Sequence, residues 1–245
     1  MESQKLSKKY RVHVYETGPN GKLNVHSLFN YFQDIASDHA ELLGFGRDDL
    51  QKNNHFWVLS RMYVEISKLP FWEDTVEIQT WPSGIEGLFA LRNYEISGNE
   101  GIIVKASSSW LILDRSTKKI QRPETAFSGH EFPPEKNFTR KATKLNPVEQ
   151  GEPNHCLRIK ASDLDINLHT NNAAYIRLIF DTYDLGFIME NDPQTVEINY
   201  LAESKFGDEI DIITYIHDCE HSHSIIRKVD RKEICRLKTN WKKAE

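Results

Sequence analysis

Hydrophobic and polar residues follow the same order twice along the chain. Near the N-terminus, residues 11–16 (RVHVYE) alternate like a β-strand, and apolar residues then recur at helical spacing from Leu28 until Gly44. In the second half, residues 155–161 (HCLRIKA) alternate in the same way, and another helical stripe follows and ends at Gly186. Each helix is followed by several strand-like runs. The pattern predicts two units, each with one long helix followed by antiparallel strands.

The strand-like runs are rich in β-branched and aromatic residues. The first unit contains WVLSRMYVEI, DTVEIQTW, LFALRNYEI and IIVKASSSWLIL, and the second contains TVEINYL, DEIDIITYI, SHSIIRKV and EICRLKTNW. A twisted antiparallel sheet can curl around one helix and bury its apolar stripe. We therefore predict an α+β protein with a tandem double hotdog fold, in which the two sheets pair side by side as in a homodimer.

Two short internal matches support a duplication. The segment 22–27 (KLNVHS) resembles 165–170 (DINLHT) at an offset of 143 residues, and 72–76 resembles 206–210 at an offset of 134. The nine-residue difference is expected in the loop around 44–56, where an insertion costs little.

A linker separates the two units. Five of the nine prolines lie between Ile120 and Pro153, in a stretch without helical or alternating apolar pattern. We place an N-terminal hotdog domain at 1–135, the linker at 136–153 and a C-terminal hotdog domain at 154–245.

Composition narrows the class of protein. With 39% hydrophobic and 27% charged residues, the 245-residue chain has enough apolar material for a core. It contains no apolar run of the ~18 residues that a membrane span needs, and MESQKLSKKY lacks the apolar stretch of a signal peptide, so we expect a cytoplasmic protein. Three cysteines without C-x-x-C spacing predict no disulfide framework. A formal net charge of −5 argues against nucleic-acid binding.

The densest group of polar side chains directly precedes the second helix. If this segment is extended, Asp165, Asn167 and His169 project from one face, while Ile166 and Leu168 point into the core. An acid, an amide and an imidazole on one face predict an acid/base array. Capping of the helix by Asp, Asn and Thr is the alternative, and spacing alone leaves it open.

The first unit has only part of this set. At the matching positions it keeps Asn24 and His26 but has Lys22 in place of the acid. Further on it has Leu69, where the second unit has Glu203. If the chemistry requires both acids, only the second unit is active, and His26 is a structural remnant.

Several motifs together identify a family. They are FWVLSRMYVEI, LPFWEDTVEIQTW and SSSWLILDRSTKKIQRP in the first half, and DLDINLHTNNAAYIRLIFD and VEINYLAES in the second. The chain closely resembles the acyl-acyl-carrier-protein thioesterases, plant and bacterial enzymes that end fatty acid synthesis by hydrolysing the thioester. The resemblance spans most of the chain. It implies that Asp165, Asn167 and His169 take the family's catalytic positions and that Glu203 is the catalytic glutamate.

We expect direct hydrolysis by an activated water. Glu203 and His169 hold and deprotonate the water, with the choice of base left open, while Asn167 orients the water or the thioester and Asp165 fixes the array. Backbone N–H groups at the helix start are expected to receive the developing oxyanion, near Asn171 and Asn172.

Covalent catalysis is disfavoured. Many plant members have a cysteine directly after the glutamate, and this chain has Ser204, which excludes a thiolate there. A serine hydroxyl would need a closely placed base.

The sequence also contains a candidate zinc site. Four residues alternate as ligands might: His217, Cys219, His221 and His223. At the offset of 134 they fall opposite a turn, so we expect a surface hairpin, no metal and no bound cofactor. The phosphopantetheine arm arrives with the substrate.

Binding surfaces are expected for both parts of the substrate. Apolar residues of the first unit form a core, part of which is a candidate acyl pocket: Leu28, Phe29, Phe32, Trp57, Met62 and Phe89. The family implies a small acidic carrier protein, so basic residues are docking candidates: Lys118, Lys119, Arg122, Lys136, Arg140, Lys141 and Lys144.

The leading interpretation is a hydrolase of fatty acyl-carrier-protein thioesters, either monomer or homodimer, that binds no nucleic acid. An acyl-CoA thioesterase and a non-catalytic acyl-carrier binding module remain alternatives. A hotdog dehydratase fits the four-residue set less well. Chain length and saturation preference are not predicted.

Overall fold

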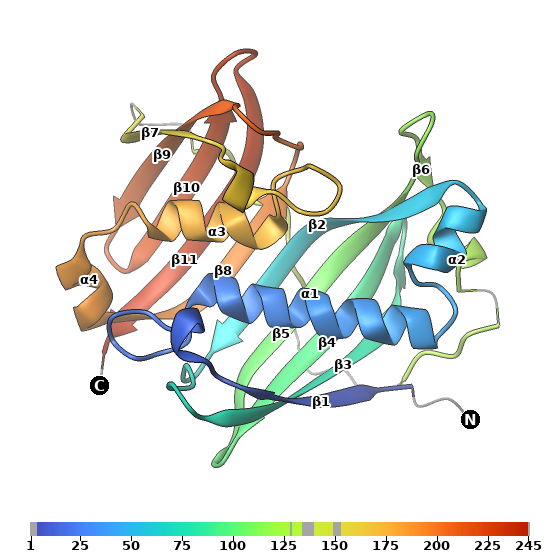
Figure 1. Cartoon of the computed structure of the whole chain (residues 1–245), viewed down its shortest axis with the longest axis horizontal. Helices are drawn as coiled ribbons and strands as arrows, with labels where there is room; N and C mark the ends of the chain where they lie inside the picture. Colours follow the sequence, from blue (N-terminus) through green and yellow to red (C-terminus); the bar gives the residue numbers. More distant parts are fainter. Residues whose placement is uncertain (1–3, 128, 134–139, 149–152, 245) are drawn as a thin grey trace.

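One antiparallel sheet of eleven strands forms the body of the protein, with two central helices on one of its faces (Figure 1). The computed structural model describes residues 4–127, 129–133, 140–148 and 153–244. In these ranges no helix is both long enough and apolar enough to cross a bilayer.

The first unit supplies the longer helix and the longer strands. Its elements are β1 (Leu6–Arg11), α1 (Val25–Leu42), α2 (Arg47–Lys52), β2 (His55–Ile66), β3 (Thr75–Glu86), β4 (Phe89–Gly98), β5 (Gly101–Asp114) and β6 (Ile120–Gln121), with 3-10 turns at Val14–Glu16 and Pro123–Thr125.

The second unit repeats this order with a shorter helix. Its elements are β7 (His155–Arg158), α3 (Asn172–Phe180), α4 (Leu185–Glu190), β8 (Asn191–Tyr200), β9 (Glu209–His217), β10 (Glu220–Arg227) and β11 (Lys232–Lys243), with a 3-10 turn at Ala161–Asp163.

The two sheets join edge to edge, as predicted for a double hotdog. The strand order is β1-β3-β4-β5-β2-β8-β11-β10-β9-β7, with β6 paired to β5. Strands β2 and β8 form the junction, where Arg61–Glu65 pair antiparallel with Thr195–Asn199. Helices α1 and α3 lie in contact on the same face (Figure 1). Side chains of α1 can therefore contact residues of α3 in the other unit.

The apolar stripe of α1 fills the core as the helical spacing predicts. Phe29, Phe32 and Ile35 are at most 1% exposed and belong to one cluster with Ile198 of the second unit. A smaller cluster gathers at the C-terminal end of α1 around Phe45, where Trp57 and Trp110 are partly buried. Burial of this apolar surface against both units stabilises their pairing.

Backbone hydrogen bonds near the starts of α1 and α3 show which residues of the two units correspond, and this correspondence differs from the predicted one. Asn24 is the N-cap of α1 and its N–H donates to the Glu16 carbonyl at 2.9 Å, whereas Asn171 caps α3 and its N–H donates to the Asp163 carbonyl at 2.8 Å. Asn24 therefore matches Asn171, an offset of 171 − 24 = 147 residues. The expected offset of 143 is wrong by four residues.

The turns before the helices obey the corrected offset. The Gly18 N–H donates to the Lys22 carbonyl at 2.9 Å, and the Asp165 N–H donates to the His169 carbonyl at 2.8 Å. Gly18 therefore matches Asp165 and Lys22 matches His169, so His26 is not the counterpart of the catalytic candidate.

The later offset of 134 is confirmed by a second set of bonds. The Asp74 N–H donates to the Phe71 carbonyl and the Asp208 N–H to the Lys205 carbonyl, both at 3.1 Å. The difference between the offsets is 147 − 134 = 13 residues, and the helices account for 18 − 9 = 9 of them. The second helix is thus short, since α3 ends at Phe180, and Gly186 lies inside α4.

Candidate active site

The segment before α3 is a tight turn, and the expectation of an extended strand there is wrong. The Leu168 N–H donates to the Asp165 carbonyl at 3.0 Å, and Leu168 has a φ of +63°, in the left-handed region. Because the chain turns here, the side chains that an extended strand would bury point outward. Ile166 and Leu168 are consequently 79% and 71% exposed instead of buried.

The carboxylate of Asp165 holds this turn together. Its Oδ1 accepts the N–H of Asn167 at 2.8 Å and the N–H of His169 at 3.1 Å, and its Oδ2 lies 3.4 Å from Nδ2 of Asn167. A short side chain with two acceptor oxygens suits this bonding of nearby backbone N–H groups. Asp165 therefore caps the turn, whereas Asn171 caps the helix by accepting the Ala173 N–H at 2.9 Å.

His169 and Glu203 meet although they are far apart in the chain. Nε2 of His169 lies 3.4 Å from Oε2 of Glu203, and the two side chains are 31% and 47% exposed. A β-bridge between His169 and Lys205 brings the segment after β8 beside the turn. Arg227 fixes this segment by donating to the Glu203 carbonyl at 2.9 Å. An imidazole and a carboxylate thus face solvent together, as an acid/base pair requires.

Ser204 lies behind this pair and is fully buried. Its Oγ is 2.7 Å from Oγ1 of Thr170 and 2.8 Å from the hydroxyl of Tyr175. Burial raises the pKa of Tyr175 to about 12. A buried hydroxyl bonded to two other hydroxyls has no base and no access to a substrate, so Ser204 does not act as a nucleophile. Neither Thr170 nor Tyr175 was predicted as a site residue from the sequence.

The start of α3 receives a residue from the first unit. Nε2 of Gln33 in α1 lies 3.3 Å from Oδ1 of Asn171, and Nδ2 of Asn172 lies 3.3 Å from Oε1 of Gln33. The sequence signal for Gln33 is weak, because it is one polar residue beside an apolar helical stripe. The N–H of Asn171 already donates to Asp163, so it is not available to an oxyanion.

Near the first unit's turn, His26 is part of α1 and mostly buried. Burial lowers its pKa, helped by the nearby Arg177 and opposed by Asp181.

The acyl-pocket candidates divide between core and surface. Four of them are core residues, at most 2% exposed: Leu28, Phe29, Phe32 and Met62. Nε1 of Trp57 donates to the Phe45 carbonyl at 2.9 Å in the smaller cluster. Phe89 stacks under Arg61, whose guanidinium is 4.9 Å from the ring centre. Since Arg61 alternates with the inward-facing Met62, Phe89 lies on the other face of the sheet, and its grouping with the core residues is wrong.

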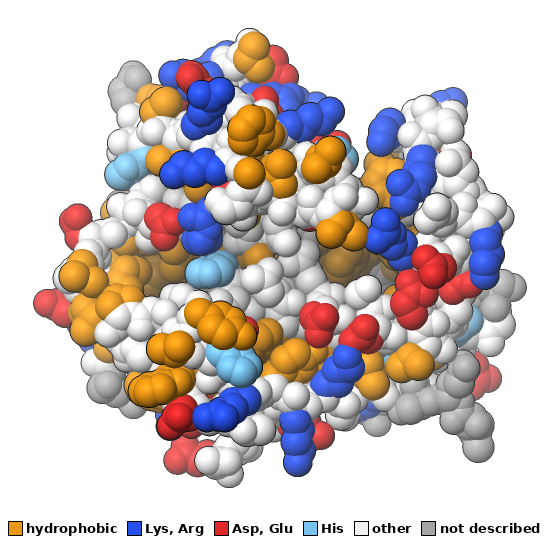
Figure 2. Space-filling view, viewed as in Figure 1, with side chains coloured by type: hydrophobic (Ala, Val, Ile, Leu, Met, Phe, Trp, Pro, Cys, Tyr) orange, Lys and Arg blue, Asp and Glu red, His pale blue; other side chains and the backbone are white. Residues whose placement is uncertain are grey.

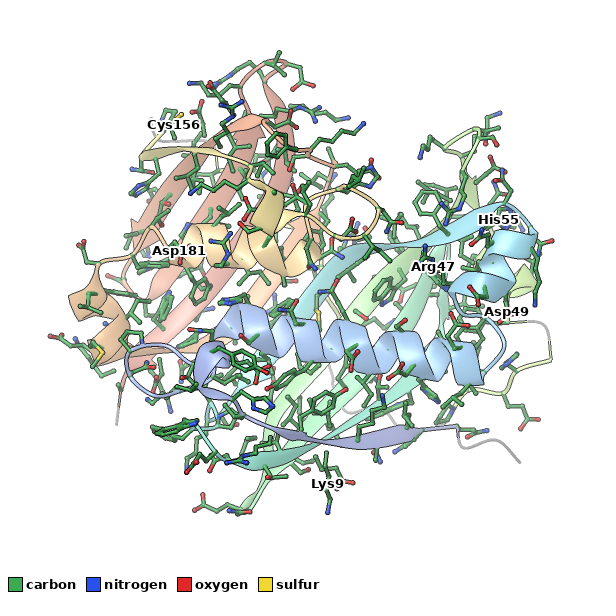
Figure 3. All side chains as sticks on the ribbon, in the orientation of Figure 1. Lys9, Arg47, Asp49, His55, Cys156 and Asp181 are labelled. Carbon is green, nitrogen blue, oxygen red and sulfur yellow. The ribbon has the colours of Figure 1, made fainter. Side chains whose placement is uncertain are left out.

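Three of the basic docking candidates surround the β5–β6 hairpin. Lys118, Lys119 and Arg122 are exposed, and none forms an ion pair with any other described residue. Figure 2 shows a hollow between this hairpin and the loop before α3, with Lys and Arg side chains on the hairpin side and hydrophobic side chains on its floor. Arg47, at the start of α2, lies on the same rim (Figure 3). Lys136 lies outside the described residues.

The remaining basic candidates lie on the linker. Arg140 forms an ion pair with Glu197, and Lys141 forms one with Glu86. Lys144 follows them and is exposed. Glu197 alternates with core residues of β8, so this linker segment crosses the sheet face that points away from the helices. The predicted patch is therefore two separate surfaces.

The alternating His/Cys segment forms the predicted hairpin. His217 ends β9 and Cys219 lies in the turn, both exposed, whereas His221 and His223 point inward. The Tyr183 hydroxyl lies 2.9 Å from a ring nitrogen of each buried histidine. Burial lowers the pKa of His223 to about 3. Over the described part of the chain, no three His, Cys, Asp or Glu side chains gather as a metal site would need.

Comparison with known proteins identifies the family. The acyl-ACP thioesterase N-terminal domain matches residues 3–127, and the acyl-ACP thioesterase C-terminal domain matches residues 147–243. The chain belongs to the acyl-ACP thioesterase family. The two matched domains correspond to the two hotdog units.

Relatives of this family are similar over most of the chain. An oleoyl-acyl carrier protein thioesterase of Coriandrum sativum is 28% identical over 84% of the chain, and a palmitoyl-acyl carrier protein thioesterase of Gossypium hirsutum is 26% identical over 97%. The aligned regions cover 61% and 63% of those proteins, so the chain spans less than two thirds of their length.

Solved structures match the whole fold. An acyl-ACP thioesterase from Bacteroides thetaiotaomicron is 27% identical, with a TM-score of 0.83 over 98% of this chain and 99% of that one. The 12:0-ACP thioesterase from Umbellularia californica is 20% identical, with a TM-score of 0.82 over 100% and 99%, and shows the same fold.

Proposed function

We propose that this protein hydrolyses the thioester of fatty acyl-acyl carrier protein and releases free fatty acid. The observation that supports it is the His169–Glu203 pair, 3.4 Å apart and open to solvent on the fold of an acyl-ACP thioesterase. Relatives named as oleoyl- and palmitoyl-acyl carrier protein thioesterases support the same substrate class.

The proposed reaction is direct attack by water. Glu203 or His169 accepts a proton from a water while the water oxygen adds to the thioester carbonyl. The tetrahedral intermediate then expels the carrier's thiolate, and the protonated base returns its proton to that thiolate. The products are a carboxylic acid and a thiol. General-base assistance of this kind contributes about 10² to 10⁴ in rate. No cofactor is needed, since the phosphopantetheine arm belongs to the substrate.

The other polar residues have supporting roles. Asp165 fixes the turn through two backbone N–H groups, and the exposed Asn167 orients the water or the thioester. Asn172 is the candidate donor to the oxyanion at the start of α3, because Asn171 already bonds to Asp163.

The carrier is proposed to dock across the hollow of Figure 2. Lys118, Lys119 and Arg122 on its hairpin side are exposed and form no ion pair with another described residue, which suits an acidic protein; Lys118 Nζ also lies 5.0 Å from the Phe56 ring centre. The acyl chain would then enter beside the partly buried Trp57.

Thiol release from matched substrates tests this function. We expect the wild-type protein to cleave an acyl-carrier thioester with higher kcat/KM than the same acyl group on CoA, and Glu203→Gln to lose about 10² or more in kcat. Glu209→Gln is the control, because Glu209 is an exposed carboxylate of the same unit that pairs with Lys228. Preference for CoA would reassign the substrate, and carrier binding without thiol release would indicate a binding module.

A further inference from the structure

Three buried hydroxyl groups lie next to the two catalytic candidates. Two of them belong to the residues that directly follow these candidates, and the third belongs to helix α3. Thr170 follows His169, Ser204 follows Glu203, and Tyr175 belongs to the first turns of α3. Ser204 Oγ bonds to both of the other hydroxyls, at 2.7 Å and 2.8 Å. Thr170, Tyr175 and Ser204, the hydroxyl trio, are 6%, 3% and 0% exposed.

Backbone groups join the same network. The Thr170 N–H donates to the Ser204 carbonyl at 2.9 Å, and the Ser204 N–H donates to the Tyr175 hydroxyl at 3.1 Å. The turn, the segment after β8 and helix α3 are thus tied at one point. His169 and Glu203 are the outward-facing neighbours of this point.

The first unit lacks the trio although it has the same backbone connection. By the two offsets, the counterparts of Thr170, Tyr175 and Ser204 are apolar and buried: Leu23, Leu28 and Pro70. The Leu23 N–H still donates to the Pro70 carbonyl, at 2.8 Å. The fold therefore forms this junction without hydroxyl groups.

Burying hydroxyl groups costs free energy unless each is bonded, and a well-packed apolar set avoids that cost. The trio occurs only in the unit that has the His169–Glu203 pair. Those two side chains are 31% and 47% exposed, so their separation depends on the backbone beneath them. A polar network with fixed bonding directions holds that backbone more specifically than packing alone.

We infer that Thr170, Tyr175 and Ser204 are positioning residues that hold His169 and Glu203 at their working separation. The inference rests on the proposed hydrolase function. It assigns no contact with substrate to the trio, whose members act through the residues next to them.

The test compares Ser204→Ala and Tyr175→Phe, which each remove one hydroxyl and add no atoms. We expect kcat on an acyl-carrier thioester to fall about tenfold in each variant, with KM within about twofold of wild type. Ser204→Cys, which keeps the size and a weak donor, should recover part of kcat. Ser224→Ala is the matched control: Ser224 is 2% exposed and its Oγ donates to Glu233 at 2.5 Å, away from the turn.

A second measurement needs no turnover. In NMR spectra of protein with ¹⁵N-labelled histidine, the His169 ring resonance, assigned with His169→Ala, should move in Ser204→Ala and Tyr175→Phe and stay in place in Ser224→Ala. An inactive wild type would refute the proposed function and leave this readout intact. Positioning is refuted if both variants keep the His169 resonance, or keep kcat within about twofold while their melting temperatures fall.

Discussion

The turns before α1 and α3 have the same backbone path and different side chains. In each, the first residue's N–H donates to the fifth residue's carbonyl, and the fourth residue has a positive φ, +72° at Gly21 and +63° at Leu168. The first turn is Gly18–Lys22 and the second is Asp165–His169. The two units thus share one turn geometry and differ in the side chains on it, and only the second turn has the proposed catalytic groups.

In the first unit, Lys22 occupies the position of His169 and forms an ion pair. Nζ of Lys22 lies 2.7 Å and 2.6 Å from the two carboxylate oxygens of Asp192, at the start of β8. Leu69, in the position of Glu203, is 7% exposed and part of the core. The first turn therefore connects the two units, where the second presents an acid/base pair.

The largest effect is expected from giving the second turn the first turn's residue. His169→Lys replaces an imidazole by an ammonium that cannot accept a proton at neutral pH, so kcat should fall by about 10² to 10⁴. The fold should persist, because the His169 side chain is partly exposed. Thiol-release kinetics measure kcat, and circular dichroism measures whether the fold persists. Lys205→Ala, at an exposed neighbour, is the control, and a kcat within tenfold of wild type would remove His169 from the chemistry.

Most periodic segments were predictable from sequence, because their pattern is local and repeated. The alternating run 11–16 is an exception, since β1 ends at Arg11 and Val14–Glu16 is a 3-10 turn. The stripe of α1 and the side-by-side pairing of the two sheets follow from apolar spacing and from the repeated pattern, whereas the pairing of β2 with β8 at the junction comes from the structure. The turn was not predictable in this way. Ile166 and Leu168 alternate with polar residues as in a strand, and the positive φ falls on Leu168, a residue type that gives no turn signal.

Shared letters misled the repeat alignment for a physical reason. Asn24 and Asn167 match by letter, but Asn24 is the helix cap, whose true counterpart is Asn171. Only Asn171 accepts a helix N–H with its side chain, whereas the Asn24 side chain makes no capping hydrogen bond and Asn167 lies in the turn, bonded to Asp165. Asparagine is common both in turns and at helix starts, so one shared letter does not fix the alignment. Asp165, Asn167 and His169 were predicted as an acid/base array from their spacing, and Glu203 was added from the family motifs. The 3.4 Å distance between the His169 imidazole and the Glu203 carboxylate follows from the fold and could not be predicted from local sequence.

The next effect concerns the carboxylate that holds the second turn. Asp165→Gly introduces the first turn's residue and removes the acceptor of the Asn167 and His169 N–H groups. We expect kcat to fall about 10- to 100-fold, because a displaced imidazole loses its alignment. Asp165→Asn keeps one acceptor oxygen and should lose less. Equal kcat in both variants and wild type would show that the turn holds without this side chain.

A smaller effect, on stability alone, is expected in the first turn. Lys22→Met breaks the pair with Asp192, whose side chain is only 16% exposed, and should lower the free energy of unfolding by about 1–3 kcal/mol. The double variant Lys22→Met/Asp192→Asn should be less destabilised than the sum of its parts. Denaturant unfolding measures this coupling. A large change in kcat of the folded Lys22→Met protein would mean that the first turn also serves the reaction.

The smallest effect is expected from the exposed aliphatic residues of the second turn, for which the first turn has Pro19 and Gly21. Ile166→Ser/Leu168→Ser should raise KM for an acyl-carrier thioester about three- to tenfold and change hydrolysis of the same acyl group on pantetheine by less than about twofold, because only a macromolecular carrier reaches the outer side of the turn. Ile216→Ser is the control, since Ile216 is 58% exposed in β9 beside the distant hairpin. Equal losses on both substrates would place Ile166 and Leu168 against the acyl thioester instead, and no loss on either would exclude this turn from docking.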